Sequence, residues 1–173
     1  MLNLNKYKTF VFDCDGVILN SNNVKTEAFK ETFSSYEKEL VEIFIRYHKV
    51  NGGISRYEKI KYFLEELVPK YDSKKKNQTY EILLRKYSSI CKRNLVQAEV
   101  SEGLIPLNNL TYNTKWLVIS GGDQSELREV FKQKGIEKYF IGGVFGSPDK
   151  KVDIIKRELH VGNIIKPALF LGD

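Results

Sequence analysis

The stretch that decides the fold is Thr-Phe-Val-Phe-Asp-Cys-Asp-Gly-Val-Ile, residues 9 to 18. Its first four residues are extended and mostly apolar in character, which indicates a short buried strand that ends abruptly at Asp13. Asp13 and Asp15 are two residues apart, and in an extended backbone such residues point the same way, so their carboxylates repel each other. A divalent cation would offset this repulsion, and hard oxygen ligands suit Mg²⁺. The alternative is that the two aspartates only form a turn, because Asp-Gly is common in turns.

Two later segments repeat the pattern of a buried strand that ends in polar residues. Residues 116–119 (Trp-Leu-Val-Ile) run into Ser120, and residues 168–171 (Ala-Leu-Phe-Leu) run into a glycine and Asp173. Ligands of open α/β sheets bind at the carboxyl ends of the strands. We therefore expect Asp13, Ser120 and Asp173 to converge at one edge of a sheet.

Helical patterns alternate with strand patterns in the last part of the chain. A helix capped by Asp123 or Ser125 is expected to end before Gly135, with a strand over residues 139–145 and a helix over 149–159. Alternating strands and helices favour a parallel α/β sheet.

The middle of the chain has a different, helical spacing of apolar residues. It predicts an all-helical block of about four helices. Ser55 is the expected N-cap of the third helix, with Glu58 at the capping-box spacing, and this helix is expected to stop near Pro69. The residues that define the four apolar faces are Val24, Ala28, Phe29 and Phe33; Leu40, Val41, Phe44, Ile45 and His48; Ile60, Phe63, Leu64 and Leu67; and Ile82, Leu83, Lys86, Tyr87 and Ile90.

Length and composition suit this architecture. The chain has 173 residues, of which 42% are hydrophobic and 29% charged, as is ordinary for a globular protein. We predict an α/β core formed by residues 1–21 and 98–173, interrupted by an all-helical insertion over residues 22–97.

Composition also limits location and partners. No apolar run approaches the roughly 20 residues of a membrane helix, and the N-terminus lacks the features of a signal peptide. We expect a cytoplasmic protein, with Cys14 and Cys91 as thiols. The net charge is +6, but the only basic run, Lys74 to Lys76, has the composition of a solvated loop. Without a nucleic-acid motif, neither nucleic acid nor membrane is an expected partner.

Four motifs in order along the chain resemble those of the haloacid dehalogenase superfamily, in its phosphatase branch with a helical C1-type cap. The resemblance covers essentially the whole chain and implies a Rossmann-like core. The motifs are Phe12-Asp13-Cys14-Asp15-Gly16-Val17-Ile18 followed by Asn20-Ser21; Ile119-Ser120-Gly121-Gly122; Gly146-Ser147-Pro148-Asp149-Lys150-Lys151; and Leu171-Gly172-Asp173.

The resemblance implies roles for the acidic residues. Asp13 would attack phosphorus and form an aspartyl-phosphate. Asp15 would protonate the leaving oxygen and then activate water. Mg²⁺ would bind the Asp13 carboxylate, the Asp15 backbone carbonyl and the Asp173 carboxylate. An aspartate at position 15 excludes the dehalogenases and the phosphonate-cleaving members, and leaves phosphatases, such as those similar to phosphoglycolate phosphatase, or phosphomutases.

The resemblance also implies a phosphate cradle. Ser120 and the backbone N–H groups of Gly121 and Gly122 would hold the transferring phosphoryl group. A lysine would stabilise its charge. Relatives with a Gly-Ser-Pro turn have this lysine three residues after the proline, which gives Lys151, and Lys150 is the alternative.

The helical insertion resembles a cap, which closes over such sites and selects the substrate. Its best candidate for a substrate-contacting segment is residues 52–56, where Arg56 is well shaped to bind a carboxylate or phosphate and Lys59 could assist. The alternative is that the glycines only break a helix and Arg56 is solvated. His48 fits a partly buried helix face better than a ligand role.

The function expected from these features is Mg²⁺-dependent hydrolysis of a small phosphorylated metabolite. A phosphomutase is the first alternative. The fourth motif of the family normally continues beyond the aspartate that corresponds to Asp173, so a truncated form with weakened metal binding is also expected. The second alternative is therefore a catalytically impaired fragment or a binding module on the same fold.

Overall fold

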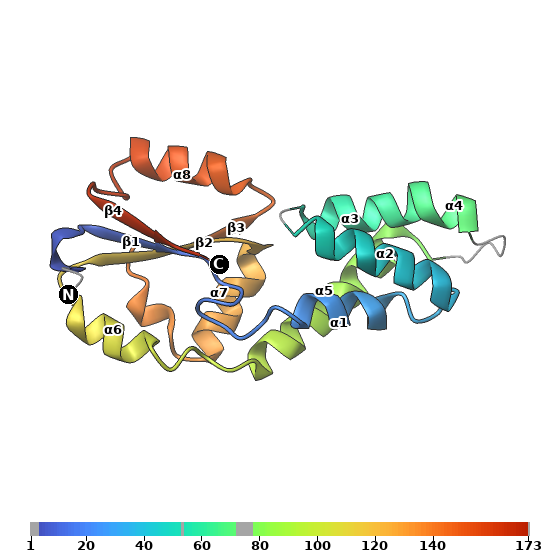
Figure 1. The fold of residues 1–173 in the computed structure, drawn as a ribbon, viewed down its shortest axis with the longest axis horizontal. Coiled ribbons are helices and arrows are strands. Elements are labelled where there is room, and N and C mark those ends of the chain that lie inside the picture. The colour runs from blue at the N-terminus through green and yellow to red at the C-terminus, as the bar shows by residue number, and fades with distance from the viewer. Residues whose placement is uncertain (1–3, 53, 72–77, 173) are drawn as a thin grey trace. The chain divides into compact units, whose positions relative to one another are not determined.

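The structure is a computed structural model that describes residues 4–52, 54–71 and 78–172 (Figure 1). Its contacts divide the chain into two compact units. The first unit comprises Met1–Ser21 and Ala98–Asp173, and the second comprises Asn22–Gln97. Gly53, the Lys74 to Lys76 run and Asp173, which feature in the expectations above, lie outside the described residues.

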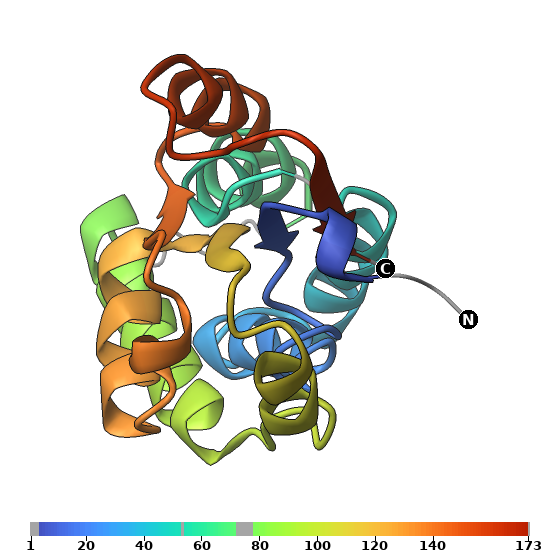
Figure 2. The same cartoon turned by 90° about the vertical axis from the view of Figure 1, so that its left-hand side faces the viewer.

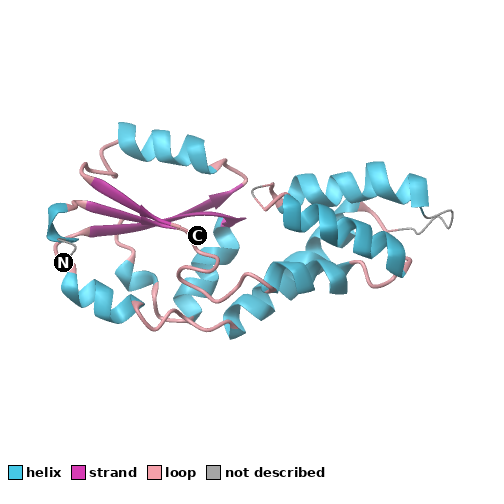
Figure 3. Ribbon diagram, viewed as in Figure 1, coloured by secondary structure: helices cyan, strands magenta, loops and turns pink. Residues whose placement is uncertain are grey.

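The first unit is built on a four-stranded parallel sheet in the order β3-β2-β1-β4 (Figure 3). Its strands are β1 (Thr9–Phe12), β2 (Lys115–Asp123), β3 (Val144–Ser147) and β4 (Ala168–Leu171). Helix α8 (Lys151–His160) covers one face, and α6 (Leu104–Leu110) and α7 (Gln124–Gln133) lie on the other (Figures 1 and 2). A 3-10 turn, η1 (Leu4–Lys6), precedes β1, and another, η3 (Glu137–Tyr139), lies between α7 and β3. The predicted parallel α/β sheet is confirmed.

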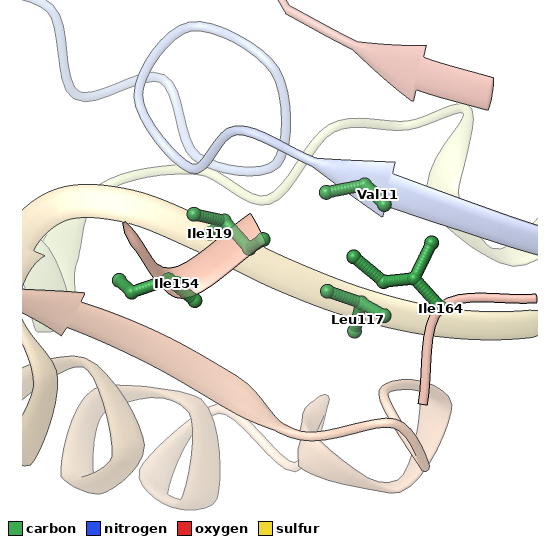
Figure 4. Close-up of a cluster of buried hydrophobic side chains, with 5 residues drawn as sticks. All are labelled: Val11, Leu117, Ile119, Ile154 and Ile164. Carbon is green, nitrogen blue, oxygen red and sulfur yellow. The ribbon is translucent and has the colours of Figure 1, made fainter. Parts of the chain in front are cut away.

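Side chains from both faces of the sheet form the core of this unit. On the face covered by α7, the ring centroid of Phe12 lies 4.6 Å from Trp116 and 5.7 Å from Phe140. Each large apolar side chain buried in this way contributes about 1.5–3 kcal/mol. The packing therefore fixes the sheet whose carboxyl edge carries the polar residues. The cluster on the α8 face consists of Val11, Leu117, Ile119, Ile154 and Ile164 (Figure 4).

The two segments that join the first unit to the second are paired with each other. Ser101 N–H donates to Ile18 O at 2.9 Å, and Asn20 N–H donates to Glu99 O at 2.9 Å. An antiparallel bridge lies between these two bonds. The chain therefore leaves and re-enters the first unit at adjacent points.

The strand expected over residues 139–145 is wrong in its bounds, because glycines form a turn there. The strand begins only at Val144. Gly143 has a φ of 102°, in the left-handed region that favours glycine. Gly142 N–H donates to Trp116 O at 2.8 Å, and a Cβ at Gly142 would lie 2.9 Å from that same oxygen.

The two helices predicted beside the sheet are present. Asp123 caps α7, with its Oδ1 accepting from Glu126 N–H at 3.0 Å, and Gly135 follows the helix with a φ of 66°. Helix α8 begins at Lys151, two residues later than expected, because Lys150 is extended, with φ −77° and ψ 142°.

The second unit is helical wherever the structure describes secondary structure in it. Ser55 caps α3 as predicted, and its Oγ accepts from Glu58 N–H at 3.3 Å. The helical segment that begins with α3 continues through η2 and α4, so that it passes Pro69 and ends at Tyr71, two residues beyond the expected stop. A π-helical turn precedes Pro69, with Val68 N–H donating to Phe63 O, and the wider turn accommodates the proline ring. Its elements are α1 (Val24–Thr32), α2 (Lys38–Val50), α3 (Arg56–Tyr62), η2 (Phe63–Leu67), α4 (Val68–Tyr71) and α5 (Tyr80–Gln97).

Aromatic rings fill the core of the second unit. Phe33 stacks on Phe63 with centroids 3.8 Å apart, and Phe29 lies 4.2 Å from Tyr87. The helices bury these faces against one another, as the apolar spacing predicted. Within the described residues, no helix is both long and apolar enough to cross a membrane.

Candidate active site

The ends of β1 and β4 lie side by side at the carboxyl edge of the sheet, with β2 next to β1. The strand expected over residues 116–119 is longer than predicted, so that Ser120 lies inside β2 rather than just past its end. Asp13 directly follows β1, and its N–H donates to Leu171 O, the last residue of β4, at 2.8 Å. Parallel pairing of Phe12 with Val118 brings the end of β1 beside β2, where Ser120 lies two residues beyond Val118. Residues far apart in the sequence thus come together here, while Asp173 lies outside the described residues.

Asp13 forms an ion pair with Lys151, the first residue of α8. Lys151 Nζ donates to Asp13 Oδ2, and Cys14 N–H donates to Asp13 Oδ1 at 2.7 Å. The Asp13 side chain is 14% exposed and that of Lys151 is 36% exposed, so the pair is only partly screened by water. Of the two lysines considered, Lys151 reaches Asp13, whereas Lys150 is exposed at the N-cap.

The segment before α8 is held against the end of β2. Ser147 Oγ donates to Gly121 O at 2.9 Å. A Cβ built on Gly146 would overlap the carbonyl oxygen of Gly122, so only glycine permits this approach. These contacts fix where Lys151 begins its helix.

Asp15 lies in a different environment from Asp13. The turn that follows β1 is closed by Cys14 O, which accepts from Ile18 N–H at 2.9 Å and Leu19 N–H at 3.0 Å. Within it, Asp15 Oδ1 accepts from Ser21 Oγ at 2.7 Å, and Ser21 is fully buried. The two carboxylates thus have separate partners, an arrangement that allows them separate chemical roles.

Ser120 is fully buried, and its Oγ accepts from Gly122 N–H at 3.0 Å. Its hydroxyl hydrogen can still donate to a ligand. Because the Gly122 N–H is already engaged, a phosphoryl group bound to both Gly121 and Gly122 would have to replace that bond. Gly121 itself is exposed.

The cation expected to bind substrate in the helical unit is buried. Arg56 is 7% exposed, so the alternative of a solvated arginine is wrong. Its Nη1 donates to Ser88 Oγ at 3.1 Å, and its guanidinium lies 4.9 Å from the centroid of the Tyr87 ring. This position holds the guanidinium through both a hydrogen bond and a cation–π contact.

Lys59 and His48 form a buried pair in the same unit. Lys59 Nζ lies 2.8 Å from His48 Nδ1, and the two residues are 2% and 8% exposed. Burial, followed by the charge of Lys25, lowers the pKa of Lys59 to about 8. Burial, followed by the charge of Lys59, lowers the pKa of His48 to about 4. His48 is thus a buried helix-face residue, as expected, and a neutral one at pH 7.

Sequence reasoning missed three contacts that shape these groups. The pairing of Lys59 with His48 and the close packing of Gly146 join residues from different elements, and the hydroxyl of Ser21 reaches Asp15 within the segment between β1 and α1. Of these contacts, only the packing of Gly146 could have been predicted from the sequence, because a glycine in a strand often marks a close approach of another backbone segment.

A family model of haloacid dehalogenase-like hydrolases matches residues 7–168. The chain belongs to this family. No curated protein matches this haloacid dehalogenase-like hydrolase.

Solved structures similar to this haloacid dehalogenase-like hydrolase share its fold at low sequence identity. A predicted phosphoglycolate phosphatase from Haemophilus somnus is 14% identical, with a TM-score of 0.71 over 99% of this chain and 79% of the other. A protein from Thermotoga maritima assigned as a β-phosphoglucomutase is 19% identical, with a TM-score of 0.62 over 94% and 74%. A magnesium-bound protein from Bacillus subtilis, assigned as a hydrolase of this type, is 17% identical, with a TM-score of 0.66 over 97% and 80%.

The donor atoms at the sheet edge fit Mg²⁺. Asp13 and Asp15 supply hard carboxylate and carbonyl oxygens. The bond from Asp13 N–H to Leu171 O joins their segment to the strand that leads to Asp173. Across residues 4–52, 54–71 and 78–172, no three His, Cys, Asp or Glu residues gather as a metal site. The site that the resemblance implies consists of two carboxylates and one backbone carbonyl, and its second carboxylate, that of Asp173, lies outside the described residues.

Proposed function

We propose that the protein is a Mg²⁺-dependent phosphate-monoester hydrolase that acts on a small phosphorylated metabolite in the cytoplasm. The observation that carries the proposal is the ion pair between Asp13 and Lys151, which joins the first motif to the third. A cation beside a carboxylate at the carboxyl edge of a parallel sheet suits the attack of that carboxylate on a phosphate.

Asp13 is the nucleophile in this proposal. A carboxylate oxygen of Asp13 attacks phosphorus, the bond from phosphorus to the ester oxygen breaks, and the leaving oxygen takes a proton from Asp15. In the second step Asp15 takes a proton from water, which attacks phosphorus and releases Asp13 and inorganic phosphate. The hydrogen bond from Ser21 supports a distinct role for Asp15, because Asp15 accepts from a hydroxyl whereas Asp13 pairs with Lys151.

The remaining groups bind the phosphoryl oxygens. The hydroxyl of Ser120 and the backbone of Gly121 and Gly122 lie at the end of β2, where the resemblance puts the phosphate cradle. Lys151 neutralises charge on Asp13 and on the entering phosphate. Lys150, exposed at the start of α8, is at most a peripheral contact.

Mg²⁺ would be held by the Asp13 carboxylate, the Asp15 backbone carbonyl and the Asp173 carboxylate. When bound, it offsets the repulsion between the Asp13 carboxylate and the phosphoryl oxygens. Arg56 in the helical unit, which we propose acts as a cap, would contact the part of the substrate that is not transferred.

A phosphomutase is the second candidate, because the structural neighbour from Thermotoga maritima is assigned as one. It would share the first step and return the phosphoryl group to a sugar rather than to water. A sugar-phosphate panel followed for both isomerisation and phosphate release separates the two functions.

The direct test is phosphate release from a panel of phosphate monoesters with Mg²⁺. We expect release by the wild type that is abolished by Asp13→Asn and by excess chelator. Asp153→Asn is the matched control, because Asp153 is an exposed aspartate on α8. Normal turnover by Asp13→Asn would rule the proposal out. A wild type that neither releases phosphate nor binds beryllofluoride with Mg²⁺ in a calorimeter would be a non-catalytic module.

A further inference from the structure

The lysine that pairs with Asp13 is the first residue of α8, where a helix is least firmly held. Helix ends fray, because the N–H groups of the first turn have no partner within the helix. A side-chain N-cap usually stabilises this turn. The N-cap of α8 is Lys150, whose side chain forms no capping bond. The position of Lys151 beside Asp13 therefore depends on contacts other than a cap.

The chain is anchored on both sides of this helix start. Upstream, Ser147 Oγ donates to Gly121 O at 2.9 Å. Downstream, Ile154 is fully buried in the core, and its N–H donates to Lys150 O at 3.0 Å. Three residues lie between these anchors, all within the described chain, and among their side chains only that of Asp149 forms a hydrogen bond or ion pair. Side-chain anchoring of this short segment thus rests on Asp149.

Asp149 pairs with an arginine from the later part of α8. Arg157 Nη1 donates to Asp149 Oδ2 at 2.7 Å. Arg157 follows Lys151 by six residues, which is about 9 Å along a helix axis. The bond therefore spans the first turn of α8 and ties the segment before the helix to the helix body.

Arg157 is itself held by two further contacts. Its Nε donates to Glu158 Oε1 at 2.9 Å, and its guanidinium lies 5.6 Å from the centroid of the Phe145 ring in β3. Glu158 is 5% exposed, and its Oε2 accepts from Asn163 Nδ2 at 2.8 Å. The planar guanidinium, with its donors in a fixed fork, suits the bridging of two carboxylates. Hydrogen bonds thus connect the buried end of α8 through Arg157 to Asp149.

The pair of Asp149 and Arg157 has little influence on global stability. Their side chains are 48% and 46% exposed, and exposed ion pairs stabilise a folded protein weakly. Replacing Arg157 should leave the protein folded, with a melting temperature changed by less than about 4 °C. A weak bond matters more at the helix start, because fraying there is nearly balanced in free energy.

We propose that Arg157 is a positioning residue: through Asp149 it holds the first turn of α8, and this turn keeps Lys151 rather than Lys150 at Asp13. The inference rests on the proposed hydrolase function, in which Lys151 stabilises charge on Asp13 and on the phosphoryl group. Arg157 acts through Lys151. Without the bond to Asp149, the first turn frays, and either lysine can approach the nucleophile.

The test measures how sharply the enzyme distinguishes the two lysines. In the wild type, kcat for phosphate release should fall far more in Lys151→Met than in Lys150→Met. Arg157→Gln should lower kcat by about two- to fivefold, the worth of an exposed ion pair, and should reduce the ratio between the two lysine effects by a similar factor. A general structural loss would lower both lysine variants equally and leave this ratio unchanged.

Three variants control for charge and for structure. Lys156→Gln is the matched control, because Lys156 is exposed on the same helix, and it should keep the wild-type ratio. Asp149→Asn should act as Arg157→Gln does, and the two together should act no more strongly than either alone. Arg157→Lys keeps the charge without the fork, so its effect should be smaller, and it replaces Arg157→Gln if that variant fails to melt cooperatively. An unchanged lysine ratio in both Arg157 variants would overturn the inference.

Amide hydrogen exchange makes the inference measurable without turnover. The N–H groups of Asp153 and Ile154 both donate to Lys150 O at 3.0 Å, so their protection reports whether the first turn is formed. In Arg157→Gln they should exchange about two- to fivefold faster, whereas amides in α7 should not change. If no ester is hydrolysed, the proposed function fails, and this exchange still decides whether Arg157 holds the helix start. Equal exchange in the wild type and Arg157→Gln would contradict the inference.

Discussion

Lys59→Met should stabilise the helical unit at neutral pH. A pKa lowered from 10.5 to about 8 means that burial disfavours the charged lysine by about 3 kcal/mol. Methionine keeps the buried stem and removes the charge, but it also removes a hydrogen bond to His48 worth roughly 1 kcal/mol. The expected net gain in the free energy of unfolding is therefore about 2 kcal/mol at pH 7.

The gain depends on pH with a definite sign. Below pH 8 the lysine is charged in both states, and the folded wild type bears the full cost. Between pH 8 and 10.5 the folded state loses its proton first, so the unfolded state binds more protons and the stability of the wild type rises with pH. The advantage of Lys59→Met should shrink across this window and be lost above it.

Urea denaturation at pH 7 and pH 10 measures both effects. Far-UV circular dichroism follows the helices, and the fluorescence of Trp116, the single tryptophan, follows the first unit separately. Lys61→Met should leave both transitions in place. A lower urea midpoint for Lys59→Met at pH 7, or a shift of equal size at both pH values, would refute the electrostatic reasoning.

Three further substitutions, with Lys150→Met as a control for the first, address the site at the sheet edge. Lys151→Met should lower kcat for phosphate release by about 100-fold or more, since it removes the charge-assisted partner of the nucleophile, whereas Lys150→Met should change it less than threefold; equal losses would contradict the assignment. Ser21→Ala should lower kcat about 10-fold because it removes the hydrogen bond that Ser21 donates to Asp15, and it should shift the pH–rate profile, which a purely structural loss would not do. Gly146→Ala forces a backbone overlap and should cost about 1–3 kcal/mol in a chemical denaturation curve, so an unchanged midpoint would show that the segment relaxes freely.

Local sequence patterns were sufficient for most of the fold. The run from Thr9 to Phe12 ends in polar residues, as a buried strand at a ligand-binding edge does. Asp123 and Gly135 carry the chemistry of a helix cap and a helix end, and both act in that way. The strand near Val144 was misplaced because Gly142 turns through a contact with Trp116, which no local pattern reveals.

The site was harder to predict because its decisive contacts are long-range. Lys150 and Lys151 are adjacent and chemically alike, and only the point at which α8 begins decides which one reaches Asp13. For Arg56 the sequence left open either substrate binding or a solvated helix start, and the packing over Tyr87 that buries it could not be foreseen. Burial depends on which elements meet, and spacing along one helix does not contain that information.

The paired connecting segments give the helical unit the character of an exchangeable module. Because Ile18 and Asn20 are bonded to Ser101 and Glu99, the ends of the insertion are held together by the first unit itself. A short turn joining Ser21 to Ala98 would close the chain without stretching the sheet. The first unit could then be expressed with its insertion deleted or replaced by one from a relative, which is the property that lets one catalytic scaffold acquire new specificities by grafting.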